Sequence, residues 1–132
     1  MPKPPPEVKA AFDAMPAGTR GSALALRDLI FRTAKENDLP VPEETLKWGQ
    51  PAYLPGPQGT TLRIGCEKTT DTCKLLVHCQ TTLVSGWRER FGDQLRFESN
   101  RAMLVDVEHT PLTQLCILEA LTYHAGRKSV SR

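Results

Sequence analysis

The sequence has almost no excess of either charge and no long apolar run. Lys and Arg number 17 against 15 Asp and Glu, which leaves a formal net charge of +2 over 132 residues. A nucleic-acid module usually carries a denser basic face, and a bilayer span needs roughly 20 apolar residues in succession. We therefore expect a single folded domain with no nucleic-acid partner and no membrane partner.

The first residues also lack the apolar segment of a secretory signal and are rich in proline instead. We expect a cytoplasmic protein with a disordered start over residues 1–6, one domain over residues 7–128 and a tail over residues 129–132. A reducing compartment predicts free thiols rather than two disulfides for the four cysteines. These cysteines are Cys66, Cys73, Cys79 and Cys116.

The motifs that fix common metal and catalytic sites are absent. The first three cysteines are separated by six and five residues, unlike the close pairs of structural zinc sites. There is no nucleophile elbow, and residues 56–59 lack the lysine and helix that follow a phosphate-binding loop. We expect a non-enzymatic protein with no metal and no cofactor. An enzyme that uses His78 or His109 is the weaker alternative.

The first third of the chain shows helical periodicity. A short helix is predicted over residues 7–14, and a longer one follows and ends before Pro40. The apolar stripe of the longer helix consists of Ala23, Leu26, Leu29, Ile30 and Thr33. Thr19 or Ser22 is expected to cap this helix. A single helical turn is predicted at residues 42–44, because proline suits the first helical position and acids suit the positive end of the helix dipole.

After residue 52 the hydrophobic period changes to two, which predicts strands. The predicted strands cover residues 52–54, 60–67, 73–79, 95–98 and 103–107. One helix, capped by Thr81, ends at Gly92, and a final helix runs from Pro111 to about Ala125. This order predicts an α+β fold, an antiparallel β-sheet with helices packed mainly on one face. The final helix is apolar around most of its circumference, so either a homodimer partner or the first long helix should cover its second side.

The candidate binding residues lie around a bent segment with two aromatic rings. Trp48, Gln50 and Tyr53 belong to this segment, and strand alternation projects Arg63 and His78 from the face of the sheet away from the helices. Aromatic rings with a few convergent polar groups are typical of a pocket for a small ligand or a protein partner. The alternative is that the two rings only cover the edge of the sheet.

Arg63 is the candidate that suits a charged ligand. A guanidinium can hold a carboxylate or phosphate with two hydrogen bonds, so we expect Arg63 to supply the charge of the site. The alternative is an exposed ion pair between Arg63 and Glu98 across the sheet, which would stabilise the fold by under about 1 kcal/mol.

Four segments resemble one known family. They are residues 48–53 (WGQPAY), 60–65 (TTLRIG), 95–102 (LRFESNRA) and 120–124 (ALTYH). In this order they resemble the YdhG-like family, small bacterial proteins built on a domain of unknown function. The resemblance implies an α+β fold with helices on an antiparallel sheet. Some members are described as frataxin-like intracellular iron chaperones, so iron binding is the alternative to binding a small molecule or a protein.

Overall fold

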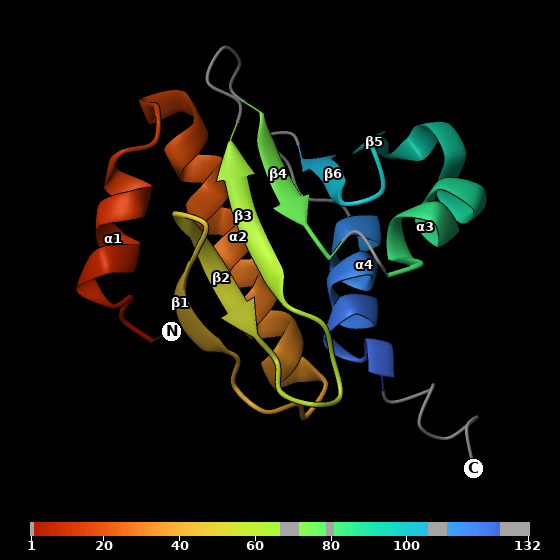
Figure 1. Ribbon diagram of the computed structural model, residues 1–132, viewed down its shortest axis with the longest axis horizontal. Helices are drawn as coiled ribbons and strands as arrows, with labels where there is room; N and C mark the ends of the chain where they lie inside the picture. The colour runs from red at the N-terminus through yellow and green to blue at the C-terminus, as the bar shows by residue number, and fades with distance from the viewer. Residues whose placement is uncertain (1, 67–71, 79–80, 106–110, 125–132) are drawn as a thin grey trace.

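The computed structural model describes residues 2–66, 72–78, 81–105 and 111–124, and Figure 1 shows their arrangement. Within these residues, four α-helices and a short 3₁₀ helix accompany six strands. The helices are α1 (Pro6–Asp13), α2 (Ala17–Glu36), α3 (Leu83–Phe91), η1 (Gly92–Gln94) and α4 (Pro111–Leu121). The strands are β1 (Glu43–Lys47), β2 (Gln50–Leu54), β3 (Leu62–Cys66), β4 (Cys73–Leu76), β5 (Arg96–Glu98) and β6 (Ala102–Val105).

The six strands form one sheet in the order β1-β2-β3-β4-β6-β5, and every neighbouring pair is antiparallel. The predicted α+β class is therefore confirmed. The predicted strands from residue 52 onward and the β5–β6 hairpin are also present. The predicted loop over residues 67–72 lies largely outside the described residues, as do Cys79, His109 and the end of the final helix.

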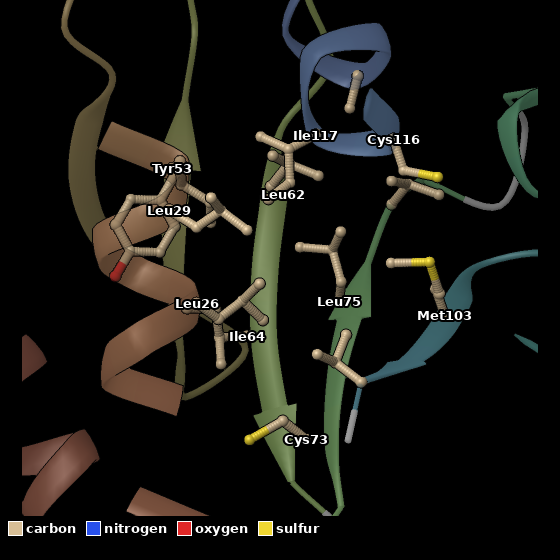
Figure 2. Packing of buried hydrophobic residues seen from close by; sticks show 14 of the residues in the cluster. Leu26, Leu29, Tyr53, Leu62, Ile64, Cys73, Leu75, Met103, Cys116 and Ile117 are labelled. Carbon is tan, nitrogen blue, oxygen red and sulfur yellow. The ribbon is translucent and has the colours of Figure 1, made fainter. Parts of the chain in front are cut away.

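All four helices pack on one face of the sheet, because their buried side chains join a single hydrophobic core. The sheet contributes Tyr53, Leu62, Ile64, Cys73, Leu75, Met103 and Val105 to this core. Figure 2 shows Leu26 and Leu29 of α2 beside strand residues of this face. Figure 1 looks onto the other face, with α2 behind the strands, and no described helix covers it. We call this second face the open face.

Helix α2 has the predicted apolar stripe, and all five of its residues are buried. Its predicted cap is wrong. The helix begins at Ala17 after Pro16, and no side chain caps it. The hydroxyls of Thr19 and Ser22 instead lie inside the protein without a hydrogen-bond partner among the described atoms. The helix starts earlier than the hydroxyl positions suggest because the Pro16 carbonyl already accepts bonds from the Thr19 and Arg20 amides.

The predicted helical turn at residues 42–44 is also wrong, because this segment starts strand β1. Strand β1 pairs with β2 over five residue pairs, from Glu43 with Leu54 to Lys47 with Gln50. Backbone hydrogen bonds to β2 outweigh the weak helix-start signal of one proline and two acids. The two strands leave only Trp48 and Gly49 for the connection. Both have positive φ, 56° and 73°, as a two-residue type I′ turn requires.

Helix α4 finds its second packing surface within the chain. It packs against α2 and α3, and the loop before β3 crosses its last turn. There the Thr60 amide donates to the Ala120 carbonyl at 2.9 Å. A side chain at Gly59 would meet the Leu121 carbonyl oxygen at 2.2 Å, so only glycine fits. Among the described residues, no helix is both long and apolar enough to cross a membrane.

Helix α3 agrees with its prediction except at its first residue. The N-cap position is Thr82 rather than Thr81, and its side chain makes no capping bond. The Thr81 hydroxyl donates to the His78 carbonyl instead, at 2.9 Å. Gly92 ends the helix with φ of 51°, a conformation that favours glycine, as predicted.

Candidate functional site

Arg63 and Gln50 meet on the open face. Arg63 Nη1 donates a hydrogen bond to Gln50 Oε1 at 2.8 Å, which joins strand β3 to the start of β2. The Gln50 amide lies over Gly65, where an added Cβ would approach Gln50 Nε2 to 2.8 Å. The absence of a side chain at Gly65 therefore makes room for the amide that orients Arg63.

Arg63 stands near the middle of the sheet, between an alanine and a leucine on the neighbouring strands. Its cross-strand partners are Ala52 on β2 and Leu76 on β4, and Leu76 in turn faces Ala102 on β6. Directly opposite residues of an antiparallel pair share one face, so these side chains form a row across the open face. Ala52 and Ala102 are fully buried there. Arg63 is therefore the longest side chain in this row.

A second guanidinium lies close to the first. Arg101 immediately precedes β6, and its carbonyl accepts a 2.7 Å bond from the Val77 amide. Burial lowers the pKa of the Arg63 guanidinium from its ordinary value, and the positive charge of Arg101 lowers it further. No described carboxylate forms an ion pair with Arg63. The two positive charges therefore repel each other, and a bound anion would relieve this repulsion.

The alternative role of Arg63, an ion pair with Glu98, is not found among the described contacts. Glu98 accepts a 2.8 Å bond from Lys74, which stands two residues from Leu76 on the same face. Both residues come from strands next to β6, so Lys74 reaches Glu98 more easily than Arg63 does. The open face also carries Lys47 on β1, by its register with Gln50. Of the two roles considered for Arg63, the pair with Glu98 is therefore the one that the structure does not support.

Trp48 and His78 are both exposed at the ends of strands. The Trp48 side chain occupies the hairpin turn immediately before Gln50, with 88 % of its surface exposed. His78 lies two residues after the end of β4, and its carbonyl accepts a bond from the Thr81 amide at 3.0 Å. Trp48 is two residues from Gln50 in the sequence. His78 lies beyond the end of β4, the strand that pairs with β3 beside Arg63.

Tyr53 lies on the opposite face of the sheet. It is fully buried in the core, where its ring meets the Phe31 ring edge-on with centroids 5.6 Å apart. Its hydroxyl donates to Glu44 Oε2 at 2.8 Å. Burial, together with the Glu44 carboxylate, raises the pKa of the Tyr53 phenol. Trp48 and Tyr53 therefore do not frame one surface, because strand alternation sends Tyr53 toward the helices.

Glu44 is the centre of a buried polar network that the sequence did not reveal. Arg27 on α2 donates to both carboxylate oxygens, from Nε at 2.6 Å and from Nη2 at 2.8 Å. Arg27 Nη2 also donates to the Pro2 carbonyl at 2.6 Å. Both side chains of the pair are only 6 % exposed. Nearly every polar atom has a partner, so the network fixes the β1–β2 hairpin on α2.

Two hollows among the described residues are lined by side chains of the α1–α2 region. One of about 650 Å³ lies at the C-terminal end of α2 and is lined by Phe31, Leu39 and Val41 among others. The other, of about 530 Å³, separates the α1–α2 corner from the β2–β3 end. We call it the corner hollow. Its lining includes Met15, Pro16, Gly49, Gln50, Gly65 and Cys66. Within the described residues no three His, Cys, Asp or Glu side chains converge as a metal site would need.

Comparison of the chain with protein-family models, with curated proteins and with solved structures finds no match. The chemistry of the site therefore has to be inferred from its residues. Arg101 was the one contributor that strand alternation could not indicate, because it stands in a turn.

Proposed function

We propose that this chain is a non-enzymatic binding domain that holds a small anionic ligand on the open face, with Arg63 as the main contact. One observation carries the proposal. Arg63 is a half-buried cation at the centre of an uncovered sheet, beside a second arginine and without a described acidic partner. A cation in this position is not needed for the core, which lies on the other face.

The Arg63 guanidinium is held in one orientation, but only part of its hydrogen-bonding capacity is occupied. Nη1 is held by Gln50, while Nε and Nη2 donate to no described residue. Those two nitrogens form one edge of the guanidinium fork, the geometry that grips a carboxylate or phosphate with two parallel hydrogen bonds. Gln50 therefore acts as a positioning residue, and the ligand would take the remaining edge.

The surroundings suit a ligand with a small apolar body. Around Arg63 the open face offers the half-buried side chains of Leu54 and Leu76. Anion binding at Arg63 and apolar contact beside it together describe a carboxylate or phosphate on a short carbon skeleton. The exposed ring of Trp48 stands near the edge of this surface and could take part in the contact with a larger partner.

The resemblance to the YdhG-like family and a cytoplasmic setting belong to the same proposal. The fold, helices on one face of an antiparallel sheet, is the fold that the resemblance implies. The cytoplasmic setting is supported by Cys66, Cys73 and Cys116, which are free thiols.

Thermal-shift and calorimetric titrations with inorganic phosphate, pyrophosphate and citrate test the proposal. We expect at least one anion to stabilise the wild type and bind one-to-one, more weakly as salt is raised. Arg63→Ala should unfold at nearly the same temperature but bind at least about tenfold more weakly, since a charge-assisted hydrogen bond contributes about 1.5–3 kcal/mol.

Arg32→Ala is the matched control, because it removes one exposed arginine from α2 on the other side of the sheet. It should bind like the wild type. If Arg63→Ala and Arg32→Ala weaken anion binding equally, the effect comes from net charge alone, and the proposed site is overturned. Tight one-to-one binding of Fe²⁺, without a response to any anion, would replace the proposal by the iron-carrying alternative.

A further inference from the structure

Two cysteines face each other across the end of the β3–β4 hairpin. Cys66 and Cys73 are direct partners in the antiparallel register, on the face that packs against the helices. Directly opposite residues in such a pair have Cα atoms about 4.5 or 5.5 Å apart. A disulfide needs about 4.4–6.8 Å, so the backbone already satisfies the main requirement for a bond between them. Both are free thiols in this structure.

The two thiols differ in access. Cys66 is partly exposed and lines the corner hollow beside Met15 and Pro16. Cys73 is fully buried, and its Sγ donates a weak hydrogen bond to the Thr19 carbonyl at 3.5 Å. Burial raises the pKa of the Cys73 thiol to about 11, and the neighbouring Cys66 adds to the shift. A small reagent entering the corner hollow therefore reaches Cys66 first.

We propose that Cys66 and Cys73 form a peroxide-reactive dithiol, in which Cys66 is attacked first and Cys73 closes the disulfide. The inference does not rest on anion binding at Arg63, although Gln50 and Gly65 also line the corner hollow. Cys66 as thiolate attacks one oxygen of hydrogen peroxide, so an S–O bond forms, the O–O bond breaks and water leaves after protonation. Cys73 then attacks the Cys66 sulfenic sulfur, which forms the S–S bond and releases the second water. Two thiols are oxidised and one peroxide is reduced to two water molecules.

The structure allows the closing step with little rearrangement. Cys73 loses one weak bond to Thr19, and a side-chain rotation turns its sulfur from α2 toward the neighbouring strand. Cys116 provides the contrast within the same protein. It is equally buried, on α4, and burial raises the pKa of its thiol to about 12. No described cysteine stands opposite it, so we expect it to stay reduced.

The sequence makes the product easy to identify. Trypsin cleaves after Arg63, Lys68 and Lys74, so Cys66 and Cys73 fall on two separate short peptides, residues 64–68 and 69–74. The full-length native protein is treated with a stoichiometric amount of hydrogen peroxide, alkylated and digested. We expect one linked pair of these two peptides, two hydrogens lighter than their sum, which disappears on reduction. The peptide that contains Cys116 should be alkylated only after unfolding.

Variants separate the proposed order from simple oxidation. Cys73→Ser should stop at a Cys66 sulfenic acid that dimedone traps, whereas Cys66→Ser should leave Cys73 unmodified under the same treatment. Urea unfolding of each variant before oxidation verifies that it is folded. The proposal is overturned if peroxide leaves all thiols free, if the linked peptides contain Cys79 or Cys116 instead, or if Cys73 in Cys66→Ser reacts as fast as Cys66 in Cys73→Ser. The first of these results would establish the pair as packing residues only.

Discussion

Glu44 and Tyr53 stand opposite each other across the β1–β2 hairpin and are joined by a 2.8 Å hydrogen bond on the side of the helices. Arg27 of α2 grips the same carboxylate with two further bonds. The hairpin that carries Trp48 and Gln50 is therefore anchored to the longest helix by one buried charge pair. Tyr53 therefore stabilises the hairpin from the helix side of the sheet and does not contribute to the open face.

Removing Glu44 should cost far more than removing the Tyr53 hydroxyl. Glu44→Ala leaves the buried Arg27 charge without a partner, which costs about 3–5 kcal/mol in comparable pairs. Tyr53→Phe leaves the bidentate pair intact and loses one hydrogen bond, about 1–2 kcal/mol. Urea unfolding gives both values. Equal losses in the two variants would contradict the view that the charge pair dominates the network.

Two glycines should respond oppositely to alanine. Gly59→Ala places a Cβ at 2.2 Å from the Leu121 carbonyl oxygen, which is backbone and cannot move aside, so we expect a loss of several kcal/mol or a failure to fold. Gly21 lies within α2 with open space around it, and Gly21→Ala should stabilise the protein by about 0.5–1 kcal/mol. Thermal melts of the two variants measure both changes in stability. A stabilised Gly59→Ala would show that the loop does not press on α4.

Alkaline pH should lower the free energy of unfolding over the pH range in which the buried thiols of Cys73 and Cys116 ionise. Burial raises the pKa of Cys73 from 9.0 to about 11 and that of Cys116 from 9.0 to about 12. Above pH 9 the unfolded chain releases these protons before the folded chain does, so the stability present at neutral pH is lost as the pH rises toward 11. Each thiol contributes at most about 1.4 kcal/mol per pH unit. Urea unfolding at pH 7 to 10.5 under reducing conditions should show a slope that becomes shallower in a Cys73→Ala, Cys116→Ala variant.

Local patterns predicted much of the fold because they report local physics. The stripe of α2, with Leu26 and Ile30 at helical spacing, requires one buried helix face wherever the helix packs. The alternation around Ile64 likewise fixes which residues of β3 enter the core, and hence that Arg63 projects from the other face. These two properties depend on local periodicity and not on the tertiary arrangement, so they can be predicted from the sequence alone.

The remaining features depend on partners distant in the chain. Glu44 became a strand residue because β2 and Arg27 meet it, 17 residues from the arginine in sequence. Nothing in the local pattern distinguishes this acid from one at a helix start. The proximity of Arg101 to Arg63 arises only once β4 and β6 pair. The site could therefore be predicted as one cation and one amide, and its second cation could not.

Trp48 occupies a turn position that a smaller residue fits better. Its φ of 56° lies in the left-handed region that bulky residues avoid, and a type I′ turn favours asparagine before glycine. The ring is 88 % exposed, so it contributes little to the core. Trp48→Asn should leave stability unchanged or raise it by up to about 1 kcal/mol. A loss of more than about 1 kcal/mol in chemical denaturation would show that the ring packs on its own chain.

Gly65→Ala is the sharpest test of how Arg63 is oriented. The new Cβ would stand 2.8 Å from Gln50 Nε2 and 3.1 Å from Leu76 Cδ1, and the amide is the more easily displaced of the two. Because Gly65 does not have a positive φ and lies in a strand, alanine should cost less than about 1 kcal/mol of folding free energy. The bond between Gln50 and Arg63 should nevertheless be lost, since the amide no longer has room over β3.

The consequence appears in anion affinity rather than in stability. An arginine that is no longer held must be ordered when the ligand binds, which costs about 0.5–1.5 kcal/mol and weakens binding about two- to tenfold. Gln50→Ala should reproduce this value, and combining it with Gly65→Ala should weaken binding no further, because both act on one hydrogen bond. Arg63→Ala should lose more than either. Wild-type affinity in Gly65→Ala, alongside lost binding in Arg63→Ala, would mean that Arg63 binds the anion without help from Gln50.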